Sequence, residues 1–176
     1  MMIPHHAQAL VMTALVPART SRPELRLVAE RIAVSQRDEI AQMQAWLRAR
    51  GHPVPAADTS MPGTRAGATA GAASGRHDAH AMLPSAHAGM PGMLTPQELQ
   101  SLAAARGPAF DRLFLELMIR HHEGAITMVQ QLFAGGGGQE SQIYAIASEV
   151  ESDQRMEIAR MRAILAALPS PAARPG

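Results

Sequence analysis

Apolar residues recur at helical spacing along most of the chain. Between about residues 3 and 50 they fall mainly three or four positions apart, which is the stripe of a helix that buries one face. The same period predicts a long helix over 109–134 and a last helix over about 140–168, joined by the glycine-rich turn 135–138. The pattern therefore predicts an all-α fold.

Helix-breaking and helix-capping residues divide this pattern into elements. The segment 17–23 ends the first helix, and Ser21 is expected to cap the second. Gly51 is expected to end that second helix. Thr95 and Glu98 have the spacing of a capping box at the start of a short helix.

The region 52–94 lacks an apolar period and is rich in Gly, Ala, Pro, Ser and Thr, a composition typical of a flexible linker. We therefore expect a first helical hairpin over 1–51 and a linker over 52–94. A short helix and a second hairpin over 95–169 are expected to pack with the first hairpin as one domain, followed by a tail over 170–176.

The two hairpins are copies of one another. The segment Met2–Met12 matches Met118–Met128 at Met, Ile, His, His, Ala and Met, and Gln36–Met43 aligns with Gln154–Met161. A single hairpin leaves its apolar stripe uncovered, so the two copies are expected to form a four-helix bundle.

The copies differ in length at their start. Eight residues, Phe110–Leu117, precede Met118, whereas only Met1 precedes Met2. We expect the first helix to lack about two turns, the sequence to be part of a longer natural protein, and a secretory signal to have been lost with the missing part. No signal is visible in the sequence itself.

Composition narrows the chemistry. The chain has no cysteine, which excludes disulfides, zinc knuckles, thiolate clusters and cysteine nucleophiles. The net charge of +1 argues against nucleic acid as a partner, and no apolar run approaches the roughly 18 residues of a membrane span. With 12 methionines and 8 histidines, any metal chemistry would use imidazole, thioether and carboxylate.

The repeat places such groups on shared helix faces, because residues three and four apart lie on one face. Met118 precedes His121 and His122 by three and four positions, and Glu157 precedes Met161 by four. The first copy repeats both spacings. The predicted metal ligands are therefore His5, His6, His121, His122, Met2, Met12, Met118, Met128, Glu39, Glu157, Met43 and Met161.

This donor set favours copper. Thioether suits Cu(I), imidazole binds copper in either oxidation state, and carboxylate suits Cu(II), iron or manganese better. Di-iron bundles use Glu-x-x-His motifs, but Glu123 follows His122 directly and the partner helices carry no histidine. Copper is therefore expected, with another transition metal as the alternative. Methionines that only fill the core, and glutamates paired with arginines, stay open as alternatives.

The linker also contains unusual residues. It is either a metal-capture tract or a low-complexity segment that happens to hold these residues. They are His52, His77, His80, His87, Met61, Met82, Met90 and Met93.

The repeated Met-x-x-His-His motif, with Met six residues after the second His, resembles the domain-of-unknown-function 305 family, which includes CopM-like copper proteins. The positions that match are Met2, His5, His6, Met12, Met118, His121, His122 and Met128. The resemblance implies a ferritin-like four-helix bundle and export to the periplasm or cell surface. In members with a known role it implies copper binding and resistance. The short first helix and the His/Met linker depart from the family pattern.

The leading hypothesis is a non-enzymatic copper protein that acts as an extracytoplasmic metallochaperone or buffer. Its partners would be metal ions and a metal-acceptor protein, and it is compatible with a homo-oligomer. One alternative is a ferritin-like metal-dependent oxidoreductase. Another is a helical scaffold or interaction module that binds no metal.

Overall fold

The computed structural model describes residues 1–61 and 89–169, and all regular structure within these residues is helical. This confirms the predicted all-α class. Its five helices are α1 (Met2–Arg19), α2 (Pro23–Ala49), α3 (Pro96–Ala104), α4 (Gly107–Ala134) and α5 (Ser141–Ala167). Among the helices in this part of the chain, none is long and apolar enough to cross a bilayer.

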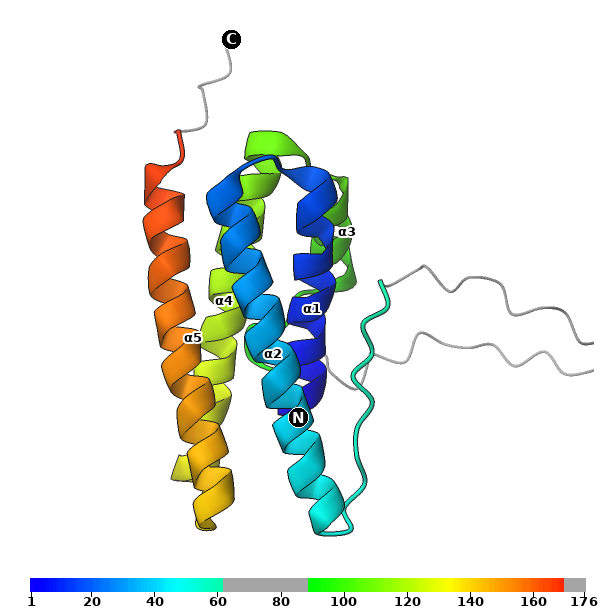
Figure 1. The fold of residues 1–176 in the computed structure, drawn as a ribbon, viewed down its shortest axis with the longest axis vertical. Helices are drawn as coiled ribbons and strands as arrows, with labels where there is room; N and C mark the ends of the chain where they lie inside the picture. The colour runs from blue at the N-terminus through cyan, green and yellow to red at the C-terminus, as the bar shows by residue number, and fades with distance from the viewer. Residues whose placement is uncertain (62–88, 170–176) are drawn as a thin grey trace, which may run out of the picture.

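The four long helices stand side by side (Figure 1). Each consecutive pair forms a hairpin, α1 with α2 and α4 with α5, and the two hairpins join through contacts of α1 with α4 and of α2 with α5. The short α3 packs against α1 and α4. Histidines on α1 and α4 and glutamates on α2 and α5 can therefore meet in one interior.

The main apolar cluster lies toward the end of the molecule where α1 gives way to α2 and where α4 begins. Phe110 and Phe114 of α4 are fully buried in it, with their rings stacked at a centroid separation of 5.7 Å. These two rings supply much of the aromatic area in a chain with three phenylalanines, one tyrosine and one tryptophan. Burial of such side chains contributes more than any surface contact to holding the helices together.

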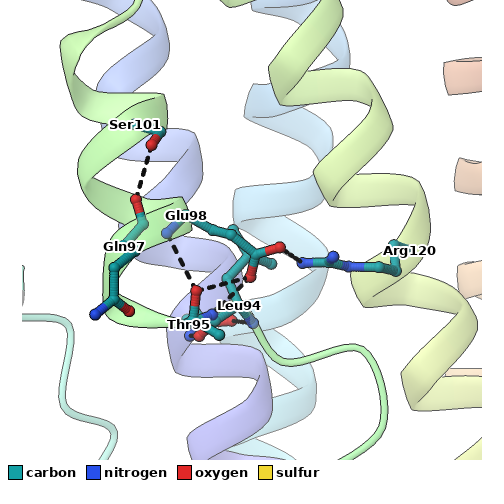
Figure 2. A network of polar contacts seen from close by, with 7 residues as sticks. Leu94, Thr95, Gln97, Glu98, Ser101 and Arg120 are labelled. Carbon is teal, nitrogen blue, oxygen red and sulfur yellow. Dashed lines mark hydrogen bonds and ion pairs between the residues drawn. The ribbon is translucent and has the colours of Figure 1, made fainter.

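The predicted capping box is confirmed at the start of α3. The Thr95 hydroxyl accepts a hydrogen bond from the Glu98 backbone N–H, and the Glu98 carboxylate accepts one from the Thr95 N–H. The same carboxylate forms a 2.7 Å ion pair with Arg120 of α4 (Figure 2). The cap therefore also fixes α3 against α4.

The start of α2 differs from the prediction that Ser21 caps it. The N-cap residue is Arg22, which provides no side-chain cap, and Pro23 takes the first helical position. A residue before proline is restricted to extended backbone, and Arg22 has that conformation. The Thr20 hydroxyl instead accepts the Arg22 N–H. Pro17 lies inside α1, which continues to Arg19.

The described parts of the predicted linker lie against the helices. Residues 52–61 have no regular structure and run beside α2 (Figure 1). At the other end, Met90 and Leu94 are buried, and the Gln8 side chain donates to the Leu94 carbonyl and accepts from the Leu94 N–H. Residues 62–88, with His77, His80, His87 and Met82, and the tail 170–176 lie outside the described residues.

Candidate metal centre

Four histidines form the centre of the interior. His5 and His6 of α1 and His121 and His122 of α4 are each at most 1% exposed. The rings of His5 and His121, which are equivalent in the repeat, lie 3.9 Å apart between centroids with their planes tilted by 35°. The α1–α4 contact thus brings the two copies of the His-His pair together.

Neighbouring histidines point to different partners because successive helical residues diverge by about 100°. His6 Nε2 forms a hydrogen bond with the carboxyl group of Glu39 on α2. His122 Nε2 forms the equivalent bond with Glu157 on α5 at 2.8 Å. Both glutamates therefore bind histidines rather than arginines, and each His–Glu pair links the two helices of its own hairpin.

The other two histidines have different surroundings. His5 Nε2 donates to the backbone carbonyl of Pro91 at 2.9 Å. His121 has no hydrogen-bond partner at either ring nitrogen, and the Nδ1 atoms of His5, His6 and His122 also have none within the described residues. Five buried ring nitrogens are therefore unpartnered, an unusual number for an interior in which buried polar groups are normally paired.

Burial favours the uncharged form of three of these imidazoles, His5, His6 and His121. Burial lowers the pKa of His5 to about 3, and interaction with His6 and His122 acts in the same direction. Burial also lowers the pKa of His6 to about 3, again with lowering from His122. Burial likewise lowers the pKa of His121 far below its usual value, with further lowering from His5. Neutral imidazole is the form that binds a metal ion, and the lowered pKa values keep His5, His6 and His121 in that form across the physiological range.

The pKa of the Glu39 carboxyl group is also shifted from its usual value. Burial is the main cause that raises its pKa to about 8, and the neighbouring Glu157 carboxyl is the second cause. Glu39 and Glu157 are both 4% exposed. Each carboxyl group is bonded to the Nε2 atom of one imidazole, so the Nδ1 atom of that ring points away from the glutamate.

Two glutamines belong to the same interior but were absent from the predicted ligand set. Gln36 and Gln154 are each 1% exposed, and both side-chain amide atoms of each are unpartnered. They lie one turn before Glu39 and Glu157. Glutamine stands at the equivalent position in both copies of the repeat, and this was the sequence signal that could have identified them. The Pro91 carbonyl carried no such signal, because any residue provides a carbonyl.

The predicted methionine ligands are divided between two ends of the molecule. Met12, Met118 and Met161 are completely buried in the main apolar cluster. Met2, Met43 and Met128 line a pocket at the opposite end. Met2 and Met12 are ten residues apart on one helix, which is about 15 Å along the axis. The imidazole centre therefore lies between two thioether groups.

The donor types suit copper, but the rings do not form a finished site. Within residues 1–61 and 89–169, no three His, Asp or Glu side chains are arranged to hold a metal ion. The five unpartnered nitrogens and adjacent thioethers match the preferences of a soft or borderline metal. Binding such an ion requires the imidazoles to turn toward one another.

The described linker residues differ in their surroundings, and Met90 and Met93 flank Pro91, whose carbonyl accepts from His5. His52 is exposed, and its ring stacks on Trp46 at a centroid separation of 6.2 Å. Met61 packs at the edge of the main apolar cluster, while Met90 is buried and Met93 is half-buried.

Comparison with known proteins gives one family and several solved structures. The model of the domain of unknown function 305 (DUF305) matches residues 1–165. A DUF305 fragment from Deinococcus radiodurans superimposes with a TM-score of 0.71 at 29% identity, covering 94% of this chain and 90% of the other. A DUF305 protein from Streptomyces coelicolor, described as a candidate secreted protein, gives 0.70 at 27%, covering 94% and 87%.

CopM in its Cu(I)-bound form superimposes with a TM-score of 0.63 at 25% identity, covering 94% of this chain and 91% of CopM. Its Cu(II)-bound form gives 0.64 at 26%, covering 94% and 90%. No protein with a curated description matches the chain.

Proposed function

The chain belongs to the DUF305 family, and from this premise we propose that it is a copper-binding protein that carries or buffers copper outside the cytoplasm. In this proposal it is not an enzyme. Copper is its cargo, and the four long helices act as a ferritin-like bundle that encloses the binding centre. A metal-acceptor protein would receive the ion, and self-association is compatible with this role.

The observation that carries the proposal is the group of four buried histidines with five ring nitrogens that have no partner among the described residues. Leaving a buried polar atom unpaired costs about 1–3 kcal/mol, so a helical core selected only for stability would replace these side chains with apolar ones. Each neutral imidazole has one nitrogen with a free lone pair, and a metal ion that binds this nitrogen removes the cost of leaving it unpaired.

The residues divide into three roles. His5 and His121, which meet across the α1–α4 contact, would hold the ion with help from His6 and His122. Glu39 and Glu157 would orient those last two rings from behind. The methionines on either side would supply thioether sulfur, whose bonds to Cu(I) are soft and suit the release of metal to another protein.

Two relatives support the choice of metal and location. CopM has been solved with Cu(I) and with Cu(II), and the Streptomyces protein is described as a candidate secreted protein. The absence of cysteine from the chain is also in keeping with a copper site built from imidazole and thioether.

The test is a competition titration of the metal-free protein with Cu(I), Ag(I) and Zn(II). We expect tight binding of Cu(I) and Ag(I), weaker binding of Zn(II), and a rise in melting temperature with the bound ions. A variant with all four histidines changed to Ala should lose this binding. If its Cu(I) affinity equals that of the original protein, the proposal is wrong.

A single variant covers the case in which the fourfold variant does not fold. His121→Leu puts an apolar side chain of similar size in place of a ring whose two nitrogens have no partner among the described side chains. We expect its Cu(I) affinity to fall about tenfold or more, equal to at least 1.4 kcal/mol. The control is His52→Ala, since His52 is exposed and its ring stacks on Trp46 rather than on the histidines of the centre. A metal-free scaffold would instead show no metal-dependent change in melting temperature.

A further inference from the structure

The turn at residues 89–94 is bound to α1 through two side chains on one face of that helix. The His5 ring donates from Nε2 to the Pro91 carbonyl at 2.9 Å. Gln8, three residues further along α1, donates to the Leu94 carbonyl at 3.0 Å and accepts from the Leu94 N–H at 2.7 Å. Because residues three apart on a helix share a face, the turn lies along the same face of α1 as His5.

The same turn is packed directly on the backbone of α4. A Cβ atom added at Gly92 would come within 2.9 Å of the His121 carbonyl oxygen, and one added at Gly124 would come within 2.0 Å of the Pro91 carbonyl oxygen. The turn therefore bridges α1 and α4 at the level where the rings of His5 and His121 lie 3.9 Å apart.

Met90 is buried in this turn but does not belong to the apolar core. It is 8% exposed, and the turn is closed by a hydrogen bond from the Met93 N–H to the Met90 carbonyl at 3.2 Å. Every other buried Leu, Ile, Val, Met or Phe among residues 1–61 and 89–169 belongs to the main apolar cluster or to one of two smaller ones, around Ile40 and around Val129. Met90 is therefore covered by the turn and the helices beneath it.

This position distinguishes Met90 from the methionines of the repeat. Those six lie in the main apolar cluster or around the pocket at the opposite end, where they pack with other apolar side chains. Met90 joins no such cluster and comes from a segment without an apolar period. A polarizable thioether that is buried at the level of the imidazoles is a donor suited to a soft cation.

The bond to Pro91 also determines which nitrogen of His5 can bind a metal ion. A carbonyl oxygen only accepts hydrogen bonds, so in the neutral ring His5 Nε2 carries the proton and Nδ1 carries the free lone pair. His5 Nδ1 has no partner among the described residues. Backbone carbonyls orient metal-binding histidines in this way. The turn thus prepares His5 as a donor and brings Met90, the residue before Pro91, to the same place.

We propose that Met90 is a thioether ligand of the copper ion held at His5 and His121. This inference rests on the proposed copper-binding function and adds a ligand from outside the two repeated hairpins. The Met90 sulfur and the His5 Nδ1 atom bind the same ion, so the turn forms one wall of the centre. Because a thioether is a soft ligand, Met90 strengthens the binding of Cu(I) and Ag(I) and contributes little to the binding of Zn(II).

The direct probe is Ag(I), which shares the soft character of Cu(I), titrated into metal-free protein whose methionine methyl groups carry carbon-13. The Met90 methyl resonance is identified because it is missing from the spectrum of Met90→Leu. In the original protein this resonance should shift and reach saturation together with the metal. If Ag(I) binds and the Met90 resonance does not shift, the proposal is wrong.

A matched pair of variants measures what the sulfur contributes. Met90→Leu keeps an apolar side chain of similar volume and removes the thioether. Its Cu(I) affinity should fall about tenfold, while its Zn(II) affinity should stay the same. The control is Met156→Leu on α5, where Met156 is 47% exposed, and this variant should keep both affinities. An equal loss of Cu(I) and Zn(II) affinity in Met90→Leu would mean that the residue only supports the turn, and would overturn the proposal.

The outcomes separate this inference from the proposed function. If His121→Leu weakens Cu(I) binding and Met90→Leu binds Cu(I) as tightly as the original protein, the copper centre stands and Met90 is not a ligand. If the original protein binds neither Cu(I) nor Ag(I), both proposals are wrong. Far-UV circular dichroism verifies that the leucine variants retain the helical fold.

Discussion

At the scale of single residues, burial shifts the pKa values of the titratable side chains in the interior. His5 and His6 have a pKa of about 3, while Glu39 has a pKa of about 8, and burial is the largest cause in each case. The lowered histidine values and the raised glutamate value share this origin, because a low-dielectric interior disfavours every charged form. Burial therefore favours the neutral forms of His5, His6 and Glu39.

These values predict how stability depends on pH in the metal-free protein. Between pH 6.5 and about 3 the unfolded chain protonates His5 and His6 while the folded chain does not. The free energy of unfolding should therefore fall as the pH is lowered through this window, by about 1.4 kcal/mol per pH unit for each histidine. Urea unfolding at a series of pH values measures this.

Glu39 acts in the opposite direction, because its raised pKa means that stability is lost as the pH rises from 4.5 to about 8. With His121 adding to His5 and His6, the histidines outweigh it below pH 6.5. An unfolding free energy that is the same at pH 6.5 and pH 4.5 would contradict this balance.

At the scale of elements, the turn at residues 89–92 is held against α4 by close backbone contact. A Cβ atom added at Gly124 would lie 2.0 Å from the Pro91 carbonyl oxygen, and one added at Gly92, whose φ is +76°, would lie 2.6 Å from the Arg120 carbonyl oxygen. Both positions therefore need glycine, because a Cβ atom would clash with the neighbouring backbone. The approach places the Pro91 carbonyl where His5 can donate to it.

Gly124→Ala is expected to destabilise the protein, although the same change in an open helix stabilises it by about 1 kcal/mol. The new methyl group would displace the backbone of the turn at Pro91, which no side-chain rotation can avoid. We expect a loss of about 1–3 kcal/mol in urea unfolding. Thr127→Ala, one turn later on α4, is the control and should change stability little. A gain in stability from Gly124→Ala would show that the turn moves away freely.

At the scale of the whole molecule, the two copies of the hairpin create two ends that differ. One end is closed around Phe110 and Phe114, and the other has the open pocket. The polar centre with its four histidines lies between them. An internal repeat therefore produces equivalent positions with unequal surroundings.

Two equivalent methionines should show this difference. Met118 is 0% exposed in the closed end, whereas Met2 is half-buried beside the pocket. Met118→Ala should cost about 2–5 kcal/mol, the usual range for removing a buried methionine side chain. Met2→Ala should cost less than about 1 kcal/mol because water already reaches that site. Urea unfolding of the two variants in parallel decides this, and equal losses would mean that both ends are equally packed.

The sequence by itself determined the helices and the equivalence of the two hairpins. Helical period, the Thr95–Glu98 cap and the duplicated His-His pairs are local properties, set by residues within a few turns of one another. They left open which histidine of each pair points inward, because adjacent residues on a helix diverge by about 100°, and the structure buries all four.

Only the tertiary structure decided how those side chains are partnered. The pairing of His6 with Glu39, the contact of His5 with Pro91, and the separation of the methionines into two groups depend on how helices distant in sequence approach one another. No period encodes that approach. It is set by the packing of apolar side chains across helices, and the open pocket beside Met2 exists because that packing is complete at one end of the molecule and incomplete at the other.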